Sequence, residues 1–202
     1  VRAVKNRYGS TSEAAIFDMD EGGLKVVENP SAVLLAERRD EDGSVVLATL
    51  EGNRPLLVEI QALVNPTNFG YPKRTASGFD LNRLNLLIAV LERRTKLKLS
   101  DKDIYINVVG GMKLSDPAAD LAICMAIASA AAGHKLAPGT VVFGEVGLGG
   151  EVRSVKAVDK RVAEAKKLGF TQALAPAVGH KKLSFIKTVT DMRSALVEYL
   201  HK

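Results

Sequence analysis

Hydrophobic and polar residues alternate along this chain in blocks that predict a mixed α/β protein. Alternation typical of strands occurs first, and apolar residues at helical spacing become more frequent afterwards. The predicted strands cover residues 13–19, 24–27, 44–50, 55–64, 104–111, 140–146, 151–155 and 173–178. The predicted helices cover residues 30–39, 81–97, 116–132, 158–170 and 190–202. Early antiparallel strands followed by alternating helices and strands favour a mixed α/β sandwich over a Rossmann sheet.

Turn-forming residues separate the predicted elements. The strands 44–50 and 55–64 are divided by Glu-Gly-Asn-Arg, which predicts a hairpin with a four-residue loop. Residues 65–79 are polar and rich in turn formers, which predicts an exposed loop. Asp80 suits the N-cap of the helix that follows, and Gly133 suits the end of the Ala-rich helix.

Composition and charge narrow the function. With 202 residues, of which 47% are hydrophobic, the chain is long enough for about one large domain and an appendage. The single cysteine excludes a disulfide framework and a zinc site built from cysteines. The net charge of +5 favours a polyanionic partner if the cations gather on one face. Because the chain has no Trp and 5% aromatic residues, any contact with nucleic acid is expected through phosphates. No apolar run approaches a membrane span and no signal peptide is recognisable, so the chain is expected to be cytoplasmic and free of membrane.

Several residues that invite a functional interpretation favour a structural one. The glycines of segment 144–152 follow neither phosphate-loop nor dinucleotide-binding spacing, so they predict a tight turn between strands. Cys124 lies in the Ala-rich helix and is expected to be a small buried residue. The three histidines lack ligand spacing, so no metal site is predicted. These are His134, His180 and His201.

The order of strand, Pro-Ala-Ala helix, Gly-Glu-Val turn, strand and helix resembles the proteolytic domain of the Lon family. In that family a lysine activates a serine nucleophile. Ala118 stands at the position of the serine and Asp159 at that of the lysine. Alanine has no attacking oxygen and aspartate reverses the charge, so the peptidase chemistry is expected to be absent. The nearest suitable side chains, Ser115 and Lys160, would need a rearranged geometry.

The segment Lys5-Asn6-Arg7-Tyr8-Gly9 resembles the Lys-Asn-Arg-Phe-Gly motif of the bacterial RadA (Sms) family, with Tyr in place of Phe. Segments 75–94, 107–122 and 143–155 resemble the C-terminal domain of that family in the same order. The resemblance implies a motif and linker over residues 1–12 and an α/β, Lon-protease-like domain over 13–202, with a mixed sheet and packed helices. It also implies a non-proteolytic scaffold and DNA-binding domain in a DNA motor for recombination, branch migration and repair.

The same resemblance implies partners and cofactors outside this segment. RadA-like proteins carry an N-terminal zinc module and a RecA-type ATPase core, so zinc, ATP and magnesium are expected there and no cofactor is expected here. Lys5 and Arg7 would then contact the γ-phosphate bound by a neighbouring subunit. The expected partners are DNA, further copies in a homohexamer, the ATPase core of the same chain and the RecA recombinase.

Six basic residues are the candidate DNA contacts, because Lys and Arg donate hydrogen bonds to phosphate oxygens. They are Lys73, Arg74, Arg83, Arg93, Arg94 and Arg153. The alternative is that they serve only solubility or, at a helix end, complement the helix dipole. Two other functions stay open: a residual Ser/Lys peptidase, and a purely structural hexamerisation module without DNA contact. Turnover of a peptide substrate would favour the residual peptidase. The absence of salt-dependent DNA binding would favour the purely structural module.

Overall fold

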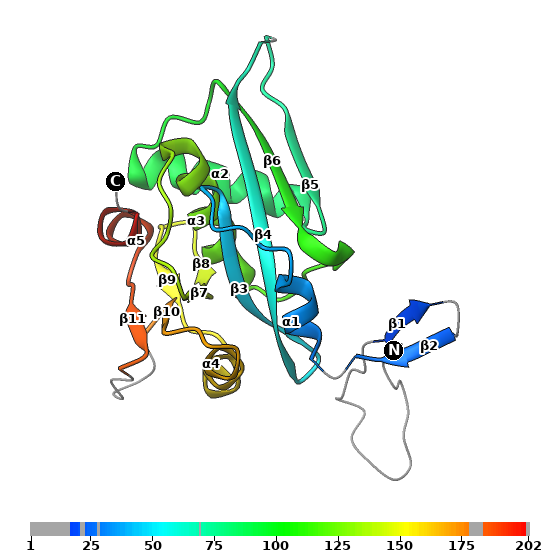
Figure 1. The fold of residues 1–202 in the computed structure, drawn as a ribbon. Coiled ribbons are helices and arrows are strands. Elements are labelled where there is room, and N and C mark those ends of the chain that lie inside the picture. Colours follow the sequence, from blue (N-terminus) through cyan, green and yellow to red (C-terminus); the bar gives the residue numbers. More distant parts are fainter. Residues whose placement is uncertain (1–16, 21–22, 28, 69, 178–183, 201–202) are drawn as a thin grey trace.

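A seven-stranded mixed sheet forms the centre of the protein in the computed structural model (Figure 1). The structure describes residues 17–20, 23–27, 29–68, 70–177 and 184–200. The sheet has the order β11-β10-β7-β3-β4-β6-β5, in which β4 runs antiparallel to β3 and β6 and the other neighbours are parallel. Its strands are β3 (Ser44–Glu51), β4 (Arg54–Pro66), β5 (Arg74–Ser77), β6 (Lys102–Val108), β7 (Thr140–Val142), β10 (Gln172–Ala175) and β11 (Ile186–Thr188). The predicted α/β class with a mixed sheet is confirmed.

Helices cover both faces of this sheet. They are α1 (Pro30–Leu35), α2 (Leu81–Thr95), α3 (Ala119–Ala132), α4 (Val158–Lys167) and α5 (Met192–Tyr199), with a 3-10 turn at Val109–Gly111. In the view of Figure 1, α2 and α3 lie behind the sheet, and α5 packs against both of them. On the other face, α1 contacts β4, and α4 contacts β3 and β4. A separate two-stranded ribbon, β8 (Glu145–Val146) with β9 (Val152–Arg153), follows β7.

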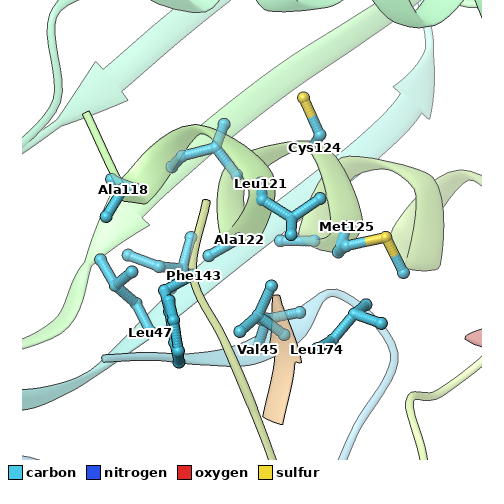
Figure 2. Close-up of a cluster of buried hydrophobic side chains, with 14 of the residues drawn as sticks. Val45, Leu47, Ala118, Leu121, Ala122, Cys124, Met125, Phe143 and Leu174 are labelled. Atoms are coloured by element: carbon cyan, nitrogen blue, oxygen red, sulfur yellow. The ribbon is translucent and has the colours of Figure 1, made fainter. Parts of the chain in front are cut away.

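The Ala-rich helix α3 is the centre of the core. Residues 119–129 of this helix are all buried, because its small side chains let the sheet and the neighbouring helices approach its backbone closely. Figure 2 shows Leu121, Ala122 and Met125 of α3 over Val45 and Leu47 of β3. The helix ends at Gly133, whose φ of 64° is the left-handed conformation expected at this position.

The start and the buried face of helix α2 both agree with the prediction from the sequence. The carboxylate of Asp80 accepts a hydrogen bond from the backbone N–H of Arg83 at 2.7 Å, so the predicted N-cap is confirmed. The apolar residues of this helix form one buried stripe, as their spacing predicts. They are Leu84, Leu87, Ile88, Val90 and Leu91.

Three predictions about turns and short strands are wrong. The β3–β4 loop has two residues and not four, because Glu51 pairs with Arg54 and Gly52 adopts a φ of 61°. The predicted loop 65–79 contains β5, a short edge strand that pairs with β6. The predicted strand 140–146 is divided between β7 and β8. The first and last predicted elements also extend into residues outside those that the structure describes.

Ala157, the residue before α4, lies in the left-handed region with φ 56° and ψ 40°. A side chain with a Cβ atom is strained in this conformation, and Ala157 is exposed, so it contributes little packing. We expect Ala157→Gly to raise the free energy of unfolding by about 0.5 to 1 kcal/mol, measured by urea denaturation. Ala163→Gly, an exposed position inside the same helix, is the matched control and is expected to lower stability by about 1 kcal/mol. A destabilising effect of both glycines would contradict the prediction.

Candidate functional site

A cavity of about 420 Å³ opens beside the N-terminal end of α3, where the Lon-like resemblance places the degenerate dyad. Its polar lining includes Ser115, Asp116, Glu145, Ser154, Lys156 and Arg161. Of the two positions that the resemblance assigns to the dyad, Ala118 is buried immediately before α3 and Asp159 is exposed in the first turn of α4. The alternatives to the dyad lie nearby: Ser115 in the cavity wall, and Lys160 with its Nζ 3.5 Å from the carbonyl oxygen of Asn53.

An ion pair between Asp116 and the buried Arg161 forms part of the lining of this cavity. Their oxygen and nitrogen lie 2.8 Å apart, and the side chain of Arg161 is 1% exposed. Arg161 also donates from Nε to the carbonyl of Lys156 at 3.1 Å and from Nη1 to the carbonyl of Ala48 at 2.5 Å. Burial lowers the pKa of Arg161, and the neighbouring Asp116 carboxylate opposes that effect.

This ion pair completes the edge of β3. The pairing of β3 with β7 ends at Leu47. Beyond Leu47, the backbone N–H and C=O groups of β3 on the side of β7 therefore have no partner in a neighbouring strand. Arg161 donates to the carbonyl of Ala48, and Asp116 accepts from the N–H of Leu50 at 3.1 Å. Asp116 also accepts from the hydroxyl of Thr49 at 3.2 Å. Two side chains thus take the place of a strand at this edge.

Backbone N–H groups at the start of α3 are all engaged. The N–H of Ala118 donates to the Asp116 carboxylate at 3.1 Å, and the N–H of Ala119 donates to the Asp116 carbonyl at 3.0 Å. The N–H of residue 120 donates to the carbonyl of Pro117 at 3.1 Å, and that of Leu121 to the carbonyl of Gly144 at 3.0 Å. The end of the helix that attracts anions is therefore satisfied from within the protein.

A second ion pair lies at the same end of α3. Arg83 of α2 pairs with Asp120, whose side chain is 2% exposed, and the hydrogen bond to this carboxylate raises the pKa of Arg83. Asp120 also accepts from the N–H of Val146 at 3.1 Å, and Arg83 donates to the carbonyl of Val146 at 2.8 Å. Arg83, a predicted DNA contact, therefore joins α2, α3 and β8.

Three other predicted DNA contacts also have partners within the protein. Arg74 donates to the carbonyls of Lys102 and, at 2.9 Å, of Leu99. Arg153 of β9 forms an ion pair with Glu151, which immediately precedes that strand, and its Nη1 lies 3.9 Å from a carboxylate oxygen of Glu145. Lys73 is exposed, and its backbone N–H donates to Asp103 at 2.8 Å, which lowers the pKa of Asp103.

The remaining two predicted contacts belong to a run of exposed cations at the end of α2. We call Arg93, Arg94, Lys96 and Lys98 the basic turn; all four are exposed. Lys96 ends the helix in the left-handed conformation with φ 64°, and Arg94 Nε lies 3.4 Å from the carbonyl of Leu148. Within the described part of the chain, none of the four is in an ion pair. Lys96 and Lys98 were not among the residues predicted from the sequence to contact DNA.

The remaining candidate residues lie outside the described part of the chain or in the core. Lys5, Arg7, His180 and His201 lie outside the residues that the structure describes. Cys124 is buried as predicted, and burial raises the pKa of its thiol. Among the described residues there is no cluster of three or more His, Cys, Asp or Glu suited to a metal ion. None of the helices in that part of the chain is long and apolar enough to span a membrane.

Fold and site together define a mixed α/β domain whose central helix begins between two ion pairs. Residues 82–178 match the model of the ChlI family, described as subunit ChlI of Mg-chelatase. A protein of Bacillus subtilis named DNA repair protein RadA is 53% identical over 178 residues, which cover 88% of this chain and 39% of that protein. The protein of the same name in Halalkalibacterium halodurans is 52% identical over 177 residues, covering 87% of this chain and 39% of the relative. The predicted membership of the RadA family is therefore confirmed for this segment, which spans about two fifths of the relatives' length.

Proposed function

We propose that this chain is a Lon-protease-like scaffold and DNA-binding segment of a RadA-type DNA repair protein, without peptidase activity. Support for the loss of peptidase chemistry comes from Ala118 and Asp159, which supply neither an attacking oxygen nor an activating ammonium. The relatives named DNA repair protein RadA support the role in repair. The whole protein would then be an ATP-driven motor that works as a homohexamer in the cytoplasm, acting in recombination and branch migration.

The observation that carries the DNA-binding proposal is the basic turn. Four exposed cations within six residues lack carboxylate partners in the described structure, so their charge is available to a polyanion. Arg83 and Arg153 already pair with carboxylates and Arg74 donates to the carbonyls of Lys102 and Leu99, whereas Arg94 of the basic turn makes a long contact of 3.4 Å with the carbonyl of Leu148. We therefore propose that the basic turn makes the main phosphate contacts, that Arg74 and Arg83 hold elements of the domain together, and that Lys73 and Arg153 are further candidate contacts.

Salt-dependent DNA binding tests this proposal. We expect the variant Arg93→Gln/Arg94→Gln/Lys96→Gln/Lys98→Gln to bind duplex DNA more weakly. The slope of log affinity against log salt concentration is expected to fall by up to about 0.9 for each lost phosphate contact. Fluorescence anisotropy at several salt concentrations measures both quantities.

The matched control replaces four exposed lysines: two in α4, one in the segment just before that helix and one in β11. These are Lys156, Lys160, Lys167 and Lys187, each replaced by glutamine. This variant has the same net charge as the basic-turn variant and is expected to retain the slope of the unmodified chain. Equal losses in the two variants would show that only net charge matters. No salt dependence in the unmodified chain would favour the purely structural hexamerisation module.

A further inference from the structure

A two-stranded hairpin lies apart from the central sheet in Figure 1. Its strands, β1 (Phe17–Asp20) and β2 (Gly23–Val26), pair antiparallel with each other and form a separate sheet. An isolated hairpin of two short strands is at best marginally stable in water. Such a hairpin becomes stable when it packs against another element. The hairpin therefore has the features of an element that packs elsewhere.

The pairing places apolar side chains on one face of the hairpin. Phe17 lies opposite Val26 and Met19 lies opposite Leu24, so these four residues share a face. Three of them are largely exposed: Met19 at 75%, Leu24 at 61% and Val26 at 63%. A contiguous exposed apolar face of this kind marks an interaction surface.

We infer that this apolar face packs against the part of a RadA-length protein that the present segment does not include. The inference rests on the proposed function. The matched relatives are much longer, because this segment accounts for 39% of their length. A second copy of the segment is a less suitable occupant. The other large exposed apolar side chains are distributed over several elements: Val33 of α1, Leu63 of β4 and Val197 of α5 are examples, and two more lie on α2.

The inference changes the position of the domain boundary. A domain that begins at residue 13 includes the hairpin, whereas α1 is the first described element in extensive contact with the central sheet. The side chain of Asn29 caps α1 by accepting from the N–H of Ala32 at 3.2 Å. The sheet domain then begins at Asn29, and the hairpin belongs structurally to the neighbouring module.

Hydrogen–deuterium exchange on this chain and on a RadA-length protein that carries it tests the inference. We expect the amides of 17–20 and 23–26 to exchange at least about tenfold more slowly in the longer protein. The variant Met19→Ser/Leu24→Ser/Val26→Ser is expected to abolish that slowing. The variant is also expected to leave the thermal midpoint of the present chain unchanged, because the hairpin adds little to its core.

The control variant Val33→Ser/Leu63→Ser/Val197→Ser replaces three similarly exposed residues of the sheet domain, and it should leave exchange in the hairpin unaffected. Equal exchange in the two proteins would overturn the inference. Slow exchange that appears in the present chain as its concentration rises would also overturn it, since a second copy would then cover the hairpin. These measurements need no DNA, so failure of the DNA-binding proposal leaves their outcome intact.

Discussion

Replacing Asp116 with alanine is expected to lower the free energy of unfolding by about 3 to 5 kcal/mol. The variant leaves the guanidinium of Arg161 buried without a counter-ion, and it removes the acceptor for the N–H groups of Leu50 and Ala118. Chemical denaturation followed by circular dichroism measures the change.

The double variant Asp116→Ala/Arg161→Met separates the buried charge from the lost hydrogen bonds. It removes the unpaired charge, so it is expected to be more stable than Asp116→Ala alone. Glu41→Ala breaks an exposed pair with Lys135 and is the control, expected to cost less than about 1 kcal/mol. Similar losses for Asp116→Ala and Glu41→Ala would show that the buried pair has no special role.

Asp120→Ala is expected to cost about 3 kcal/mol, the second largest effect among these variants. It leaves the N–H of Val146 buried without its acceptor and removes the counter-ion of Arg83. It also removes a negative charge from the first turn of α3, where such a charge is favourable. The shift in the denaturation midpoint measures the effect.

Arg153→Gln is the matched control for Asp120→Ala, since it breaks an ion pair at the surface, where solvent screens the charges. Its expected effect on the free energy of unfolding is within about 0.5 kcal/mol. If Asp120→Ala changed the free energy of unfolding no more than Arg153→Gln, the interactions of Asp120 with Arg83 and Val146 would not contribute to stability, and the prediction would be wrong.

Elements with a strong apolar signal were predictable from the sequence. The stripe of α2 and the buried length of α3 are examples, because burial of one face or of a whole helix leaves a periodic or continuous apolar pattern. The strands β5 and β11 left no such signal. They are short edge strands with exposed residues, and they exist because a neighbouring strand offers hydrogen bonds.

The site was predictable in part. The assignment of positions 118 and 159 to a dyad rests on the order of the motifs and stays a prediction, whereas Arg161 was missed among the basic residues of α4. A signal was present, because Arg161 shares the buried stripe of that helix with Val158, Val162 and Ala165. An arginine on an apolar stripe predicts a buried counter-ion. The identity of that partner, Asp116, depends on tertiary structure, since the two residues are far apart in the sequence.

The engaged N–H groups at the start of α3 have a consequence for acyl-transfer chemistry. Stabilising the negative oxygen of a tetrahedral intermediate requires free backbone donors aimed at it. Here the donors of residues 118 through 121 already bind oxygens of the protein itself. A serine introduced at position 118 would supply a hydroxyl without supplying an oxyanion hole in this helix turn. Acyl-transfer catalysis at this position would require the backbone around Asp116 to rearrange, in addition to any change of side chains.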